Sequence, residues 1–199
     1  MNKEKPIILA SASITRRRIM KAAGLFFVFK RPHVDEGVLK LVATKRGCSP
    51  LQTAEFLAKS KAESISRQFR NKYVVGADQV LRFRNKIIHK PQSVAMAKKA
   101  LQILNGKKHQ LITSTCVFKD GKMIWKCTTT NILYMNKMTK EEINKYLHMI
   151  GKNNILSIGI YQIEGLGIRL FTKIEGDFFS ILGLSLIQLL GFLRKKRII

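Results

Sequence analysis

Residues Ile7–Met20 read IILASASITRRRIM, and the order of residue types in this stretch predicts three elements of structure. A short apolar run, Ile7–Ala10, is followed at once by small hydroxyl residues and then by three arginines. This order predicts a buried strand, a tight loop and the first turn of a helix. A loop that leads from a strand into a helix gathers backbone N–H groups that have no intrahelical acceptor, so such a loop suits an anion.

The side chains of this loop point to the same kind of ligand. Ser11 and Ser13 offer hydroxyl donors, and Arg16–Arg18 offer guanidinium groups whose N–H donors match phosphate oxygens. We therefore predict that the loop forms one wall of a phosphate site. Taken alone, the stretch is equally compatible with an ordinary strand, turn and helix whose arginines are solvated.

The chain is strongly basic. Its 199 residues include 37 Lys and Arg against 12 Asp and Glu, a formal net charge of +25. Such a charge attracts polyanions, which makes a basic nucleic-acid-binding module the second function to consider. The basic residues are scattered, however, and no zinc-finger spacing or aromatic reader motif accompanies them, so we expect no specific nucleic-acid partner. A drifted base composition of the genome would also produce this charge.

Cysteine usage and hydropathy predict where the protein resides. Cys48, Cys116 and Cys127 form no CxxC pair and are odd in number, which favours free thiols in a reducing cytosol. The longest apolar run, Ile181–Leu193, is too short to span a bilayer. We therefore predict a cytoplasmic protein without a membrane span.

The first half of the chain alternates between apolar runs and helix signals. Strands are predicted at Ile7–Ala10 and Leu25–Lys30, with a short helix, Arg16–Ala23, between them. The segment Arg31–Gly37 is predicted to be a loop, and the basic residues Val38–Ser49 a flexible segment.

A longer helix and a strand are predicted next. Pro50 stands where a helix would begin, and small apolar residues recur at helical spacing after it, while Lys59 and Lys61 lie off that apolar stripe. The β-rich run Tyr73–Ala77 is predicted to be a strand that ends at Asp78.

The second half is predicted to be rich in hairpins. Asp120-Gly121 joins two long β-rich runs, and this dipeptide is a strong hairpin signal. Further helices are predicted at Ser93–Leu104, from Thr139 to about Met149, and at Leu184–Leu193. Because helices alternate with strands early and hairpins come late, we predict an α/β fold whose elongated mixed sheet is flanked by helices.

Several side chains are candidates for chemistry. Asp78, at the predicted carboxyl end of a buried strand, is placed to hold a divalent cation or to take a proton from water. Asp35 and Glu36 could supply a second carboxylate. Lys90, held extended by the proline after it, could meet a phosphate, and Gln162 could read a base edge. Each has an ordinary alternative as a turn cap or a solvent-facing residue.

Eight segments follow one another in an order that matches a known family. They are ILASAS followed by Arg16 and Arg17, VDE at Val34–Glu36, LAKSKA at Leu57–Ala62, VGADQV at Val75–Val80, KP at Lys90-Pro91, G-x-x-H at Gly106–His109, YQIEGLG at Tyr161–Gly167 and IEGDFFSILGL at Ile174–Leu184. In this order the chain resembles the Maf (septum-formation) family of nucleotide pyrophosphatases, from Ile7 to about Leu193.

The resemblance implies a Maf/ITPase-like fold over residues 1–199, a single domain with two lobes around a central cleft. It implies an enzyme that hydrolyses nucleoside triphosphates, standard or modified, to the monophosphate and pyrophosphate. It further implies a divalent cation, Mg²⁺ or Mn²⁺, and a homodimer. Of two subgroups in the family, one favours dTTP and UTP and the other 7-methyl-GTP; Asp78-Gln79 is closer to the second and Tyr161–Gly165 to the first, so the preferred base stays open.

The resemblance also implies a role for each matching position. Asp78 would be the proton acceptor, and Glu36 would join it as a catalytic residue and as a metal ligand. The remaining positions would bind the substrate: Ser11, Arg16, Lys61, Lys90 and Gln162.

Four residues depart from the family pattern. Ile14 replaces a proline and Thr15 an arginine in the first loop, and Ser185 replaces a late proline. Ile160 stands where a small residue is usual, and at a cleft wall it would narrow the base pocket. These departures keep a third alternative open, a catalytically degenerate family member that acts in cell-division control.

Overall fold

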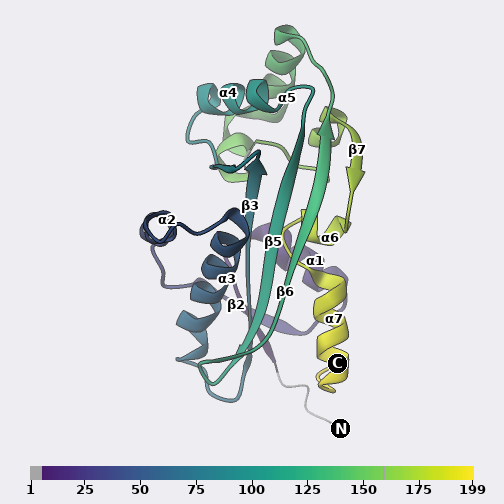
Figure 1. Ribbon diagram of the computed structural model, residues 1–199. Coiled ribbons are helices and arrows are strands. Elements are labelled where there is room, and N and C mark those ends of the chain that lie inside the picture. The colour runs from purple at the N-terminus through teal and green to yellow at the C-terminus, as the bar shows by residue number, and fades with distance from the viewer. Residues whose placement is uncertain (1–5, 159) are drawn as a thin grey trace. The chain divides into compact units, whose positions relative to one another are not determined.

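The computed structural model describes residues 6–158 and 160–199, and Figure 1 shows their helices and strands. The chain divides into two compact units. Unit 1 comprises Met1–Val80, Ile112–Thr129 and Asp177–Ile199, and unit 2 comprises Leu81–Leu111 and Thr130–Gly176. The predicted single domain over residues 1–199 with two lobes stays a prediction.

The strands form a mixed sheet, as the sequence predicts. Their order is β2-β1-β3-β5-β6-β7, with β4 paired to β3. Strand β1 is parallel to β2 and to β3, whereas β4 is antiparallel to β3 and β7 to β6. The strands are β1 (Ile7–Ala10), β2 (Phe27–Lys30), β3 (Tyr73–Phe83), β4 (Lys86–Ile88), β5 (Lys108–Lys119), β6 (Lys122–Met135) and β7 (Phe171–Glu175).

Helices cover both faces of the sheet in unit 1. They are α1 (Ile14–Ala22), α2 (Glu36–Lys45), α3 (Pro50–Ser66), α6 (Phe178–Ile181) and α7 (Leu186–Lys195). Because side chains alternate along a strand, Ile8 and Ala10 of β1 pack with α3, while Ile7 and Leu9 pack with α1 and α7. Figure 1 shows α3 and α7 on opposite sides of the central strands.

The close packing of α3 on β3 depends on small residues. A Cβ atom on Gly76 would lie 2.5 Å from the carbonyl oxygen of Ala58 and 2.7 Å from the Cβ of Ala62. Only glycine at position 76 therefore allows the helix to approach this strand so closely. The VGAD and LAKSKA segments meet at this contact.

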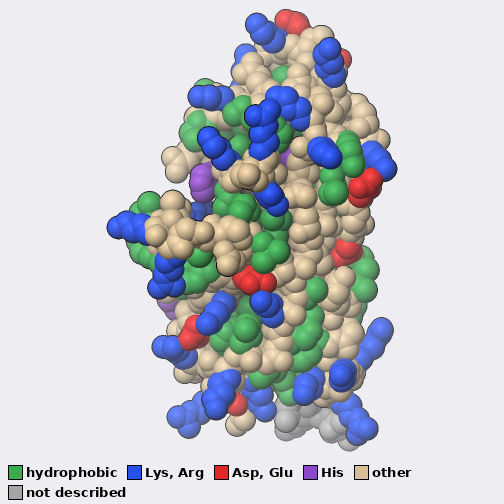
Figure 2. Space-filling model, viewed as in Figure 1, with side chains coloured by type: hydrophobic (Ala, Val, Ile, Leu, Met, Phe, Trp, Pro, Cys, Tyr) green, Lys and Arg blue, Asp and Glu red, His purple; other side chains and the backbone are tan. Residues whose placement is uncertain are grey.

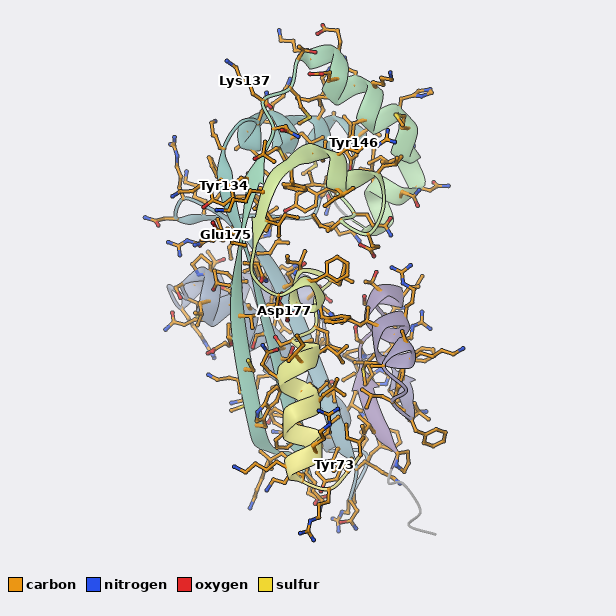
Figure 3. The ribbon with its side chains drawn as sticks, turned by 90° about the vertical axis from the view of Figure 1, so that its right-hand side faces the viewer. Tyr73, Tyr134, Lys137, Tyr146, Glu175 and Asp177 are labelled. Atoms are coloured by element: carbon orange, nitrogen blue, oxygen red, sulfur yellow. The ribbon has the colours of Figure 1, made fainter. Side chains whose placement is uncertain are left out.

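Unit 2 has its own hydrophobic core. Helices α4 (Val94–Leu104) and α5 (Lys140–Ile158) and the 3-10 helix η1 (Leu166–Leu170) bury their apolar side chains against one another. Strands β6 and β7 are joined by the hydroxyl of Tyr134, which donates to Glu175 Oε2 over 3.3 Å; Figure 3 labels both residues.

Two local predictions are wrong. The segment Val38–Ser49 was expected to be flexible, yet most of it lies in helix α2, because the carboxylate of Asp35 accepts from the N–H groups of Gly37 and Val38 and caps the helix. Strand β3 does not end at Asp78 but continues through it to Phe83.

The other main elements are confirmed. Helix α3 begins at Pro50 behind a capping box, and α4 follows the N-cap Ser93. Asp120 and Gly121 have φ angles of 50° and 76° and form the tight turn between β5 and β6. Within the described residues, we find no helix with the length and apolar character needed to cross a membrane.

Candidate active site

The loop after β1 has the predicted structure. Ser13 is the N-cap of α1, and its hydroxyl accepts a hydrogen bond from the backbone N–H of Arg16 at 3.3 Å. The Ser11 hydroxyl accepts from the N–H of Ser13 at 3.2 Å. These bonds fix the loop against the start of a nine-residue helix, whose N-terminal end favours an anion.

Arg16 is held rigidly behind this loop. Its Nε donates to the carbonyl oxygen of Gly183 at 2.7 Å, and one Nη donates to the Ser11 hydroxyl at 3.2 Å. Gly183 has a φ of +95°, and a Cβ there would lie 3.2 Å from the guanidinium. Burial lowers the pKa of Arg16, while the charges of Asp78 and Glu36 oppose that shift.

The neighbouring arginine faces another direction. The guanidinium of Arg17 lies over the ring of Phe29 in β2, 4.2 Å from its centroid. Arg16, not Arg17, lines the cavity described below. Arg16 therefore lies at the candidate site and Arg17 does not, and the role of Arg16 in substrate binding stays a prediction.

Two carboxylates converge on one ammonium. Lys61 Nζ lies 2.6 Å from a carboxylate oxygen of Glu36 and 2.6 Å from one of Asp78. Lys61 and Asp78 are each only 6% exposed, whereas Glu36 is exposed. The resemblance had placed Lys61 in the site, although the apolar periodicity of the helix places it off the core stripe.

The strand register explains this convergence. Strand β1 ends at Ala10, which pairs with Gly76, so that β3 continues past the end of its neighbour. Asp78, two residues further, faces the same side as Gly76, which is the side of α3 and Lys61. Glu36 reaches the same point from the first turn of α2.

The charges of this cluster perturb one another. Burial raises the pKa of the Glu36 carboxyl, but the ammonium of Lys61 outweighs it, with smaller contributions from Lys40 and Arg16, and the pKa falls below 4.5. Glu36 is therefore ionised at neutral pH and carries a full negative charge toward Lys61.

A cavity opens beside these groups. Its volume is about 720 Å³, and all of its lining residues belong to unit 1. Lining residues include Ser11, Ser13, Arg16, Glu36 and Lys61, together with Arg31, Pro32, Val34 and Asp35 from the loop before α2. Asp78 is not one of the lining residues, and its carboxylate accepts a hydrogen bond from Lys61 Nζ at 2.6 Å.

The sequence profile of one family, described as Maf-like protein, matches residues 6–196. The chain belongs to the Maf family. This membership confirms the resemblance and the α/β class that it implies.

Relatives of this Maf family member have names that describe an activity. A 7-methyl-GTP pyrophosphatase of Rhizobium etli is 39% identical over 189 residues, which is 95% of each chain. A nucleoside triphosphate pyrophosphatase of Granulibacter bethesdensis is also 39% identical, over 191 residues, 96% of this chain and 97% of its own length. Another of that name, from Bradyrhizobium diazoefficiens, is 37% identical over 98% of this chain and 96% of its own.

Two residues predicted for this Maf site, Lys90 and Gln162, belong to unit 2. Gln162 sits in a tight turn, where its carbonyl oxygen accepts from the N–H of Gly165 at 3.1 Å. A Cβ on Gly167 would collide with the backbone of Gln162, so this glycine is required by the close approach. The roles of Lys90 and Gln162 in substrate binding stay predictions.

Ile160 does not occupy the place that the sequence suggested. The side chain was expected at a cleft wall, but it is buried in the hydrophobic core of unit 2 with residues of α4 and α5. The departure from a small residue at this position therefore fills a core rather than narrowing a pocket.

Sequence reasoning missed some contributors to the site. Arg31 lines the cavity, but its segment carries only the signal of a loop. Asp35, which the sequence did name as a candidate carboxylate, also lines it. The side-chain amide of Gln79 donates to the hydroxyl of Thr113 at 2.8 Å and to the carbonyl oxygens of Ser180 and Ile181 at 3.0 Å each. It therefore anchors the segment that carries Gly183. The position of Gln79 directly after Asp78 was the only feature of the sequence that pointed to a role near the site.

The donor set fits a divalent cation that is shared with a substrate. Mg²⁺ prefers oxygen ligands and is commonly bound by one or two carboxylates together with substrate phosphates. Glu36 and Asp78 supply two carboxylates that already converge on one point. Among the described residues no group of three or more His, Cys, Asp and Glu is arranged to hold a metal by itself.

Proposed function

We propose that this Maf family member is a nucleoside triphosphate pyrophosphatase whose active site is the cavity of unit 1. The observation that carries the proposal is the convergence of Glu36 and Asp78 on Lys61, next to the anion-binding loop of Ser11 and Arg16. Paired carboxylates beside a cationic phosphate loop are suited to cleaving a phosphoanhydride.

The cationic wall would bind the triphosphate. Arg16, fixed by Gly183 and Ser11, presents a preorganised guanidinium, and the start of α1 presents backbone N–H groups. Lys61 adds a second positive charge at the floor of the cavity. Preorganised positive groups lower the energy of the charge that develops on the phosphate oxygens in the transition state.

Asp78 would accept the proton in the chemical step. The oxygen of a water molecule forms a bond to the α-phosphorus, the bond from that phosphorus to the bridging oxygen breaks, and pyrophosphate leaves. The water proton passes to a carboxylate oxygen of Asp78. The products are a nucleoside monophosphate and pyrophosphate.

Glu36 and Asp78 would also hold the divalent cation, Mg²⁺ or Mn²⁺. When bound there, the cation supplies charge neutralisation for the phosphate oxygens. Glu36 suits this role because it is ionised at neutral pH. The exposure of its side chain, 50%, leaves room for a shared ligand from the substrate.

We propose a triphosphate with a modified base as substrate, with 7-methyl-GTP as the first candidate. The support is the name of several relatives between 35% and 39% identical, among them proteins of Rhizobium and Brucella. Other relatives of similar identity carry the general name nucleoside triphosphate pyrophosphatase. The proposal therefore has two parts, the pyrophosphatase reaction and the preference for a particular base, and the second can fail without the first.

The test is product analysis with Mg²⁺ or Mn²⁺ on 7-methyl-GTP, GTP, dTTP and UTP. We expect monophosphate and pyrophosphate, with the fastest turnover for 7-methyl-GTP. Diphosphate and inorganic phosphate would contradict the reaction. A stable, folded protein that cleaves none of the four would favour a degenerate family member, and faster turnover of dTTP or UTP would overturn only the base preference.

Two expectations from the sequence belong to the same proposal. A reducing cytosol is supported by three free thiols, Cys48, Cys116 and Cys127. A homodimer rests on the family resemblance, and sedimentation equilibrium tests it directly. Figure 2 shows Lys and Arg side chains at many places on the visible face.

A further inference from the structure

Lys61 occupies the point at which the two candidate metal ligands converge. Its ammonium lies 2.6 Å from Glu36 and 2.6 Å from Asp78, and the side chain is buried. A divalent cation bound by both carboxylates would need the same space. The ammonium and the cation would also repel each other strongly in a partly buried site.

We propose that Lys61 is a resident counter-ion that keeps divalent cations out of the site until a nucleotide is bound. This inference rests on the proposed function, because it treats Glu36 and Asp78 as the metal ligands. Without nucleotide, the ammonium of Lys61 offsets one of the two carboxylate charges, and Lys40 Nζ lies 3.7 Å from the second oxygen of Glu36. The cluster then attracts a divalent cation weakly.

The nucleotide changes this balance by supplying phosphate oxygens. A triphosphate in the cavity gives the Lys61 ammonium new anionic partners, because Lys61 lines that cavity. The flexible lysine stem lets the ammonium turn from the carboxylates toward phosphate. Both carboxylates then become available to a cation that enters with the nucleotide.

The same movement would uncover the proposed proton acceptor. Asp78 is 6% exposed, does not line the cavity, and is bonded to Lys61. A water molecule reaches its carboxylate only after the ammonium has moved. Lys61 therefore links the arrival of substrate to the availability of both the metal site and the base.

The experiment measures Mn²⁺ binding to the nucleotide-free protein by electron paramagnetic resonance. We expect weak binding by the wild type and at least about tenfold tighter binding by Lys61→Gln, because one opposing charge near the ligands is removed. Lys61→Met is the second charge-removing variant, in case the amide disturbs the buried site. Circular dichroism establishes that each variant is folded.

A matched control comes from the same helix. Lys59 is exposed on α3, so Lys59→Gln removes one positive charge without touching the carboxylates, and its Mn²⁺ affinity should equal that of the wild type. Adding Asp78→Asn to Lys61→Gln should abolish the gain. A general charge effect would instead raise the affinity of Lys59→Gln as much as that of Lys61→Gln.

Two results overturn the inference. One is a folded Lys61→Gln or Lys61→Met protein that binds Mn²⁺ no more tightly than the wild type. The other is tight Mn²⁺ binding by the nucleotide-free wild type, provided that Glu36→Gln abolishes this binding. This second result can be obtained without any Lys61 variant. Pyrophosphate release is measured separately, so a failure of the proposed reaction is distinguishable from a failure of this inference.

Discussion

The two units bury ionisable side chains in opposite ways. In unit 1, the side-chain nitrogen of Lys61 lies 2.6 Å from a carboxylate oxygen of Glu36 and 2.6 Å from one of Asp78. In unit 2, His109 is 2% exposed, its Nε2 lies 2.6 Å from the hydroxyl of Tyr161, and burial lowers its pKa to about 4. At neutral pH the imidazole of His109 is therefore neutral, whereas the Glu36 carboxyl is ionised, because the ammonium of Lys61 outweighs the effect of burial and lowers its pKa.

This difference separates the proposed active site from a buried polar contact in a hydrophobic core. A buried charge needs an opposite charge, and such pairs can be redirected toward a substrate. A buried neutral imidazole needs only hydrogen bonds and ring contacts, and His109 has Tyr161 and Phe171 around it. Its Nδ1 is buried without a hydrogen-bond partner among the described residues. His109 thus fixes the start of the Tyr161–Gly167 segment.

The largest effect is expected from a substitution that removes one carboxylate of the charged group in unit 1. Asp78→Asn should lower kcat by about 10³-fold or more, because it removes the proton acceptor while Glu36 still pairs with Lys61. Steady-state pyrophosphate release measures it. Asp120→Asn makes the same chemical change in the hairpin turn of unit 1 and should leave kcat unchanged. Asp78 is not catalytic if the folded variant turns over at the wild-type rate.

The next prediction concerns how the unfolding free energy changes with pH through His109, the neutral buried group of unit 2. The folded state holds His109 neutral down to about pH 4, whereas the unfolded chain binds a proton below about 6.5. Stability should therefore fall as pH falls from 6.5 to 4.5, and His109 should account for about 2 to 3 kcal/mol of that loss.

Urea unfolding at both pH values measures this contribution. His109→Gln should lose that part of the acid sensitivity, whereas His148→Gln, an exposed histidine on α5 of the same unit, should keep it. Equal acid sensitivity of wild type and His109→Gln would contradict a neutral buried imidazole.

A smaller effect is expected from a substitution at the close contact between α3 and β3, which brings Lys61 near Asp78. Gly76→Ala would place a Cβ 2.5 Å from the carbonyl oxygen of Ala58, so α3 must shift away from β3. We expect a loss of about 2 kcal/mol in unfolding free energy and reduced turnover, because Lys61 moves with α3. Gly191→Ala, with nothing within 4 Å of its added Cβ in α7, should stabilise by about 0.5 to 1 kcal/mol. Wild-type stability of Gly76→Ala would refute the close contact.

The smallest effect concerns neutral hydrogen bonds inside unit 1. The N–H of Ser185 donates to the buried hydroxyl of Thr115 at 3.0 Å, a bond that the usual proline of the family cannot make. Ser185→Pro should cost about 1 kcal/mol. A second substitution, Thr115→Val, should cost less in the Ser185→Pro background than in the wild type. Additive losses in this double-mutant cycle would show that the bond contributes nothing.

Local signals predicted most elements of the fold. Capping residues and small apolar residues at helical spacing defined α3, and Asp120-Gly121 defined the hairpin. Helix α2 was missed because its cap, Asp35, precedes a basic sequence without a clear apolar stripe. Strand β3 was predicted to end too early because Asp78 and Gln79 interrupt its apolar run, although pairing with its neighbours carries the strand through them.

The sequence could name candidate residues for the site, but it could not predict how they lie relative to one another. Family resemblance named Glu36, Lys61 and Asp78, yet no pattern indicates that one ammonium lies between two carboxylates. That arrangement depends on α3 approaching β3 over Gly76 and on where β1 ends. Arg31 joins the cavity only through the path of its loop. Such long-range placement leaves no local trace in sequence.

The hydrogen bond from Arg16 to the carbonyl oxygen of Gly183 has a consequence during synthesis on the ribosome. Residues 11 to 78 supply the loop, the lysine and both carboxylates early, but the acceptor that fixes the guanidinium is translated more than a hundred residues later. A nascent chain halted before Gly183 should therefore hold the proposed catalytic groups without the carbonyl oxygen that anchors Arg16. Hydrolysis of nucleotides would begin only after the last helix of unit 1 has left the exit tunnel.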